Sequence, residues 1–116
     1  MTQMNEKMPL ANRIIRRGEV YHANLDDAIG HEQKNDKNTE RRSVVVVSNN
    51  KQNEHSKVVV VVPLSSKVHN LKPSFQVPTC FHGKPGKAKC EQLRAIDVER
   101  LLGEKRELSR PLLSKV

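Results

Sequence analysis

The stretch RRSVVVVSNNKQNEHSKVVVVVPLSS, residues 41–66, decides the fold of this chain. Two valine blocks, Val44–Val47 and Val58–Val62, flank a polar connection. Such blocks are too short for buried helices, and β-branched side chains favour the packed surface of a sheet. A continuous apolar run, unlike a strict alternation, is typical of a strand covered on both faces. We therefore expect two central strands in a small β domain.

Each valine block is bordered by a residue that can take part in chemistry. Arg42 precedes the first block, and Ser65 follows the second. If the two strands pair as antiparallel neighbours, the start of the first lies beside the end of the second. We therefore expect Arg42 and Ser65 at the same rim of the sheet, where a site can form.

Length and composition indicate one small domain. The chain has 116 residues, 35% of them hydrophobic and 3% aromatic, so its modest core must consist mostly of valine, leucine and isoleucine. No run approaches the ~18–20 apolar residues that span a membrane, and the N-terminus lacks the features of a secretory signal. We therefore expect a cytoplasmic protein without membrane contact, in which Cys80 and Cys90 are free thiols.

The charge distribution favours a polyanionic partner. The formal net charge is +8, and no acidic residue occurs between Glu54 and Glu91. The lysines in that interval are Lys57, Lys67, Lys72, Lys84, Lys87 and Lys89. A solvated surface is the ordinary interpretation, but one sign of charge over a whole interval favours a face that contacts phosphates.

Further strands are expected on both sides of the valine blocks. Alternating residues within 16–25 predict a half-buried first strand, and the polar segment 26–41 predicts a long loop. Pro73 and Pro78 favour an edge strand or an irregular crossover. A turn centred near Pro85 predicts a hairpin of residues 77–82 and 88–93, with Cys80 and Cys90 roughly opposite each other.

The C-terminal part of the sequence predicts short helices. In residues 95–103, Asp97 is a suitable N-cap, with Leu101 and Leu102 facing inward. A second short helix is expected from Ser109 to the end of the sequence. This order of elements predicts an antiparallel, barrel-like sheet with helices at one end.

Neither a metal nor another cofactor is expected. His69, Cys80, His82 and Cys90 are conceivable metal ligands, but their spacing contains no CxxC pair, and we favour two small apolar thiols in a hairpin. Phosphate-binding loops of the GxxxxGK[ST] and GxGxxG types are missing, and so are the aromatic residues of an RNA-stacking platform.

Metal-free cleavage of RNA suits the residues that remain. RNA supplies its own nucleophile, the 2′-hydroxyl, so the protein must hold the phosphodiester, stabilise the phosphorane and move protons. A guanidinium such as that of Arg42 suits the phosphorane charge, and the Ser65 hydroxyl suits a non-bridging oxygen. On spacing alone, a solvated arginine and a turn serine remain the simpler interpretation.

The chain resembles the MazF/PemK family of toxin endoribonucleases from type II toxin–antitoxin systems. The resemblance rests on four ordered blocks within residues 16–113: RRGEVYHANLDDAIGHEQ, RRSVVVVSN, VVVVVPLSS and CEQLRAIDVERL. It implies a mainly β fold, an SH3-like antiparallel β-barrel of the CcdB/PemK type with short helices at the C-terminal end. This barrel is expected in residues 16–116, after a mobile N-terminal arm of residues 1–15.

The resemblance also implies an activity and partners. Members of this family cleave single-stranded RNA, including mRNA, at short sequences without a metal, leaving a 2′,3′-cyclic phosphate and a 5′-hydroxyl. They form homodimers in the bacterial cytoplasm and are neutralised by an antitoxin. The alternative is a binding module, either a same-fold toxin that poisons a protein such as DNA gyrase or an RNA-binding barrel without activity.

The family's catalytic arginine corresponds by position to Arg42, and its catalytic hydroxyl corresponds to Ser65. Glu32 is a further catalytic candidate. The residues expected along the RNA path are Gln33, Arg41, Ser66, Lys67, Gln92 and Arg94. The chain has Ser43 where proline is usual, and its loop before Arg42 is longer than is common, so we expect altered RNA access or sequence preference.

The sequence does not identify the general base. Deprotonating arginine near neutral pH would cost about 7–9 kcal/mol, so we expect Arg42 to stabilise the phosphorane and to be able to protonate the leaving 5′-oxygen. The candidate bases are Glu32, His22, His31, His55 and His69. For any one of these histidines, a plain surface role is the simpler interpretation.

Overall fold

A computed structural model describes residues 14–25, 34–35, 41–67, 70–81 and 83–107, with the backbone alone for 81 and 103–107. Within these residues the chain is mainly β. The strands are β1 (Glu19–Ala23), β2 (Arg42–Val46), β3 (Val58–Ser65), β4 (Gln76–Phe81), β5 (Lys84–Lys89), β6 (Arg94–Asp97) and β7 (Leu101–Glu107). One short helix, α2 (Asn50–His55), and two single 3₁₀ turns, η2 (Cys90–Gln92) and η3 (Val98–Arg100), complete the described part.

The two valine blocks form antiparallel neighbours, as the sequence predicts. The register pairs Val44 with Pro63, Val45 with Val62 and Val46 with Val61. Alternate side chains of these strands enter two different core clusters, because successive residues of a strand point to opposite faces. Val44 and Val46 belong to one cluster and Val45 to the other, so both faces of the pair are covered.

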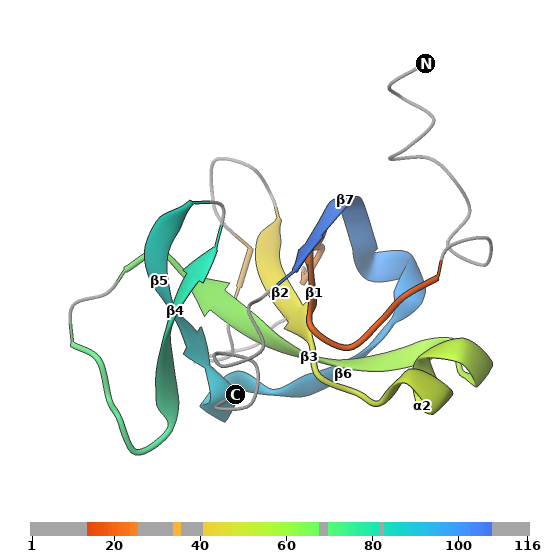
Figure 1. Ribbon diagram of the computed structural model, residues 1–116, viewed down its shortest axis with the longest axis horizontal. Coiled ribbons are helices and arrows are strands. Elements are labelled where there is room, and N and C mark those ends of the chain that lie inside the picture. Colours follow the sequence, from red (N-terminus) through yellow and green to blue (C-terminus); the bar gives the residue numbers. More distant parts are fainter. Residues whose placement is uncertain (1–13, 26–33, 36–40, 68–69, 82, 108–116) are drawn as a thin grey trace.

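Every strand pairing is antiparallel, and the sheet follows the order β4-β5-β3-β2-β1-β7, with β6 paired to β3. Figure 1 shows the β4–β5 hairpin at one end of β3 and α2 at the other end. The predicted mainly β fold is therefore confirmed. In the described part of the chain the sheet is barrel-like but open, because its end strands β4 and β7 are not paired with each other.

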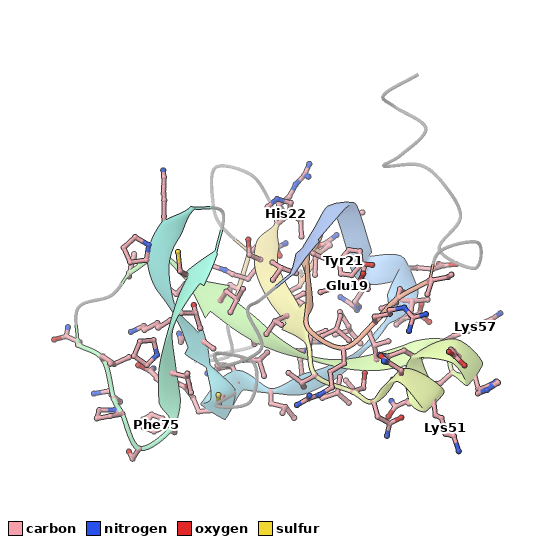
Figure 2. The ribbon with its side chains drawn as sticks, in the orientation of Figure 1. Glu19, Tyr21, His22, Lys51, Lys57 and Phe75 are labelled. Carbon is pink, nitrogen blue, oxygen red and sulfur yellow. The ribbon has the colours of Figure 1, made fainter. Side chains whose placement is uncertain are left out.

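Buried polar groups in β1 are satisfied locally. Glu19 is almost fully buried, and its Oε1 accepts hydrogen bonds from the Tyr21 hydroxyl at 3.0 Å and from the Arg16 backbone N–H at 2.7 Å. Figure 2 shows Glu19 and Tyr21 together in the interior, far from the exposed Lys51 and Lys57 at the α2 end. These bonds offset the cost of burying a carboxylate.

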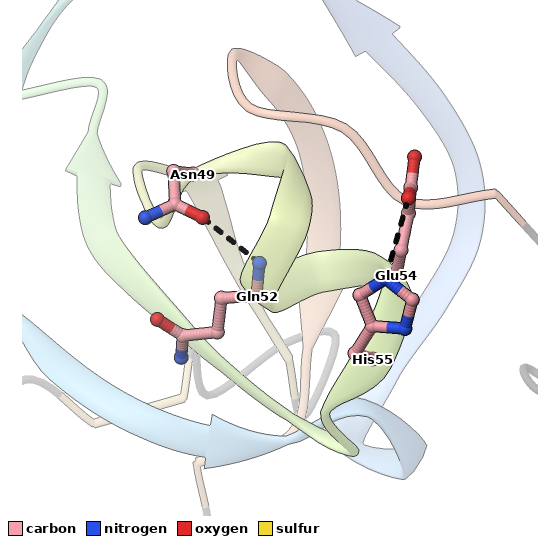
Figure 3. Close-up of polar contacts among 4 residues, drawn as sticks. All are labelled: Asn49, Gln52, Glu54 and His55. Carbon is pink, nitrogen blue, oxygen red and sulfur yellow. Dashed lines mark hydrogen bonds and ion pairs between the residues drawn. The ribbon is translucent and has the colours of Figure 1, made fainter.

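The connection between the valine strands contains a helix where only a polar turn is expected. The Asn49 side chain caps α2 by accepting a hydrogen bond from the Gln52 backbone N–H at 2.8 Å (Figure 3). The buried Asn53 side chain donates to the Ser48 carbonyl at 3.0 Å. These bonds attach α2 to the end of β2 and hold the hairpin connection in one conformation.

The β4–β5 hairpin is shifted from the prediction. Phe81 pairs with Lys84, so the turn lies between these two residues rather than near Pro85, and Gly83 has a φ of +73° that favours glycine. Cys80 therefore lies opposite Pro85, and the expected Cys80–Cys90 opposition is wrong. β4 is an edge strand, as its proline predicts.

The predicted helix over 95–103 is also wrong. Asp97 does act as an N-cap, accepting from the Glu99 N–H at 2.9 Å, but the helical segment η3 ends at Arg100. Leu101 is buried as predicted, yet it lies in β7, opposite Ala23 of β1. A short isolated helix is marginal, whereas pairing with β1 satisfies the backbone and buries the same leucine. The second predicted helix lies outside the described residues.

Replacing Val61 with alanine should destabilise the fold by about 2 kcal/mol, because its fully buried side chain belongs to the core cluster that contains Val46 and Ile96. The same change at Val58, which is 41% exposed on the same strand, should cost much less. Urea unfolding midpoints measure both effects. Equal losses at the two positions would contradict the assigned burial.

Candidate active site at the rim of β2 and β3

Arg42 and Ser65 lie opposite each other at one rim of the sheet. The β2–β3 pairing ends at the Val44–Pro63 pair, and continuing this register by two residues places Arg42 across from Ser65. Directly opposed residues of an antiparallel pair carry their side chains on the same face. The rim predicted from the two valine blocks is therefore present.

Ser65 is 8% exposed, and its hydroxyl is held in place. Its Oγ accepts a hydrogen bond from the Lys67 backbone N–H at 3.2 Å. A hydroxyl that accepts at oxygen can still donate its own hydrogen. The geometry is therefore suited to donating to an anionic oxygen placed over the rim.

The Arg42 side chain is oriented by the segment that precedes β2. Its Nε–H donates to the Lys34 carbonyl at 3.1 Å. Asn35 fixes this segment, because its Oδ1 accepts from the Leu25 N–H at 2.7 Å and its Nδ2 donates to Asn24 Oδ1 at 2.8 Å. Since the Nε–H is engaged by Lys34, a phosphate contact by Arg42 must use the terminal guanidinium nitrogens.

Two lysines that the predictions omit lie beside this pair. Lys87 of β5 is directly opposite Ser65, and it is 8% exposed. Lys89 follows on the same face of β5, opposite Gln76 of β4. The acid-free interval of the sequence contains both lysines, but only the true position of the hairpin turn reveals which of its lysines reach the rim.

Burial, together with neighbouring cations, lowers the pKa of Lys89. Partial desolvation of the ammonium is the largest cause, and the positive charges of Lys87, Arg42 and Lys67 act in the same direction. The Glu91 carboxylate opposes them. Gln76 holds this carboxylate through a 2.9 Å hydrogen bond from its Nε2 to Glu91 Oε2. Three cations therefore lie within electrostatic range of Lys89 at this rim.

The other predicted RNA-path residues fall into three groups. Arg41, Ser66 and Lys67 flank β2 and β3 at the same rim as Arg42 and Ser65. Gln92 lies in η2, which contacts β3 and β4. Arg94 opens β6 opposite Val61, four residues before Ser65 along β3. Glu32 and Gln33 lie outside the described residues, so their roles stay predictions.

Neither of the histidines that the structure describes shares both the face and the rim of Arg42. His22 lies opposite Ser43, so by strand alternation it points to the other face from Arg42. His55 ends α2 beside Glu54, with 3.8 Å between Nε2 and Oε2 (Figure 3), and α2 precedes the opposite end of β3 from Ser65. His31 and His69 lie outside the described residues.

In the described part of the chain, no group of three or more His, Cys, Asp or Glu side chains could hold a metal ion. Cys80 and Cys90 are free thiols, and burial, followed by the Glu91 charge, raises the pKa of the Cys90 thiol. Among these same residues, none of the helices combines the length and apolar character that crossing a bilayer requires.

The pKa of Lys89 should lie below the ordinary lysine value of 10.5. Replacing Lys67 with glutamine removes a repelling charge and should raise the Lys89 pKa, whereas Glu91→Gln removes the attracting charge and should lower it further. NMR titration of the lysine side chains measures these shifts. A Lys89 pKa that responds to neither substitution would contradict the cation cluster.

Comparison with known proteins agrees with the fold. Residues 16–116 match the family model described as PemK-like, MazF-like toxin of type II toxin–antitoxin system. No curated protein sequence matches the chain significantly.

Three solved structures that resemble this one share 21–23% sequence identity with it, a level that establishes the common fold. MazF from Deinococcus radiodurans is 23% identical, with a TM-score of 0.74 and coverage of 90% of each chain. An endoribonuclease from Mycobacterial species is 21% identical, with a TM-score of 0.65 and coverage of 89% of this chain and 84% of the other. An endoribonuclease in complex with its cognate antitoxin, also from Mycobacterial species, is 21% identical, with a TM-score of 0.64 and coverage of 87% of this chain and 85% of the other.

Because the family model matches nearly the whole sequence, this chain belongs to the PemK-like, MazF-like toxins of type II toxin–antitoxin systems.

Proposed function

We propose that this protein is a toxin endoribonuclease that cleaves single-stranded RNA, including mRNA, at specific sequences and without a metal ion. The observation that carries the proposal is the Arg42–Ser65 pair at a rim that also holds Lys67, Lys87 and Lys89. Membership of the MazF-like toxin family and the endoribonucleases among the structural relatives support it.

The reaction proposed is transesterification. The 2′-oxygen of the cleaved nucleotide attacks the adjacent phosphorus while the bond to the 5′-oxygen breaks, leaving a 2′,3′-cyclic phosphate and a 5′-hydroxyl. RNA itself supplies the nucleophile, so the protein's contribution is to position the phosphodiester and to stabilise the charge of the phosphorane.

The chemistry of each side chain suits it to one role in this reaction. The Arg42 guanidinium stabilises the phosphorane, and the Ser65 hydroxyl donates to a non-bridging oxygen. Lys89 is better suited than Arg42 to protonate the leaving 5′-oxygen, because its lowered pKa makes the proton easier to release. Glu32 stays the candidate base, while Gln33, Arg41, Ser66, Lys67, Gln92 and Arg94 are proposed to contact the RNA chain.

The proposed partners follow the family. Structural relatives are solved as complexes with a cognate antitoxin or with MazE, which supports an antitoxin as the neutralising partner of this chain. We also propose a homodimer that acts in the bacterial cytoplasm, where mRNA is available.

Replacing Arg42 with alanine should lower the cleavage rate of a long single-stranded RNA by about 10²–10³-fold, because one preorganised donor to the phosphorane is lost. Binding of the same RNA should weaken far less, since one of several cations is removed. The assay contains EDTA, and binding is measured with a 2′-O-methyl RNA that cannot react.

Arg16→Ala serves as the matched control, because Arg16 is exposed and lies at the other end of β2 from Arg42, beside Gly18, which bonds to Val46. This variant should cleave like the wild-type protein. RNA that stays intact with the wild-type protein but binds tightly would support the binding-module alternative and contradict the proposed nuclease.

A further inference from the structure

Lys87 occupies an unusual place for a lysine. It lies in β5, between β3 and β4, with Ser65 opposite it on one side and Pro78 on the other. Only 8% of the residue is exposed, although lysine is rarely buried to this degree in proteins. A lysine covered to this degree has most of its side chain packed against its surroundings.

Arg42, Ser65 and Lys87 form one row across the neighbouring strands β2, β3 and β5. β3 lies between β2 and β5 in the sheet, so Ser65 at the end of β3 lies between the strands that carry Arg42 and Lys87. Directly opposed residues share a face of the sheet. The two long side chains can therefore approach an anion over the Ser65 hydroxyl from opposite sides.

The charges around this row favour an anion there. Lys87, Arg42 and Lys67 each lower the pKa of Lys89, so all three lie within electrostatic range of Lys89. An anion bound at this row relieves that repulsion. A phosphodiester is such an anion, and its two non-bridging oxygens match a site with a cation on either side.

We propose that Lys87 is a further catalytic residue of this site, binding the non-bridging phosphate oxygen opposite the one that Arg42 binds. This inference rests on the proposed ribonuclease function. During the reaction the 2′-oxygen bonds to phosphorus as the bond to the 5′-oxygen breaks. The 2′-hydroxyl proton passes to the general base, for which Glu32 stays the candidate, and the 5′-oxygen receives a proton from Lys89.

The test uses an RNA oligonucleotide with a single phosphorothioate at the cleaved linkage, separated into its Rp and Sp forms. Sulfur replaces a different non-bridging oxygen in each form. The full-length wild-type protein, Lys87→Met and Lys87→Arg are compared in EDTA. Lys51→Met is the matched control, because Lys51 is exposed on α2, which precedes the opposite end of β3 from Ser65.

Lys87→Met should cleave ordinary RNA about 10²-fold more slowly at saturating RNA, with KM changed only a few-fold. Sulfur in either the Rp or the Sp form should slow cleavage by the wild-type protein. In Lys87→Met, sulfur should slow cleavage in only one of the two forms. Lys87→Arg, which keeps the charge, should retain most of the rate, and Lys51→Met should behave like the wild-type protein.

Other outcomes would overturn the inference. One is a Lys87→Met variant that cleaves at the wild-type rate. Another is a slow variant in which the Rp and Sp rates keep their wild-type ratio, because a purely structural loss affects both forms alike. If the wild-type protein binds RNA but does not cleave it, the proposed function fails. The contact between Lys87 and the phosphate oxygen is then tested by binding: Lys87→Met should remove the difference in affinity between the Rp and Sp RNAs. Equal wild-type affinities would then overturn the contact as well.

Discussion

The antiparallel register between β2 and β3 is the constraint on which the rest of this structure depends. It pairs Val45 with Val62 and sends alternate valines into two cores on opposite faces. Because the side-chain period of a strand is two, a slip of one residue would exchange the two faces and turn Arg42 away from Ser65. Burial on both faces makes such a slip costly, so the cores that stabilise the fold also fix the site.

β3 extends this constraint to the other side of the site. Its first half pairs with β6, its middle with β2 and its last two residues with β5. The end of one strand thereby holds Ser65 between Arg42 of β2 and Lys87 of β5. The side-chain hydrogen bonds of Asn35 and Asn53 lie outside these strand pairings. They attach Asn35 to the end of β1 and α2 to the end of β2. Rigid strands therefore supply the row, while side-chain bonds orient the loops beside it.

The sequence predicts the centre of the molecule better than its periphery. Unbroken valine runs specify buried strands strongly, and antiparallel pairing then determines that Arg42 and Ser65 meet. The hairpin is less determined, because the glycines and prolines of residues 82–87 allow more than one turn position. Because Phe81 pairs with Lys84, the turn is not centred near Pro85 and Lys87 lies opposite Ser65, which the sequence alone did not reveal. Leu101 shows the same limit, since its burial is compatible with a helix or a strand until its pairing with Ala23 is known.

A double-mutant cycle tests most directly whether the β2–β3 register creates a single catalytic unit. Single-turnover cleavage of RNA in EDTA is measured for the wild-type protein, Arg42→Ala, Ser65→Ala and the double variant. If both side chains act on the same phosphate, the double variant should be little slower than Arg42→Ala alone, because residues that act as a unit are strongly non-additive. Losses that multiply fully would show that Arg42 and Ser65 act independently and would contradict the account.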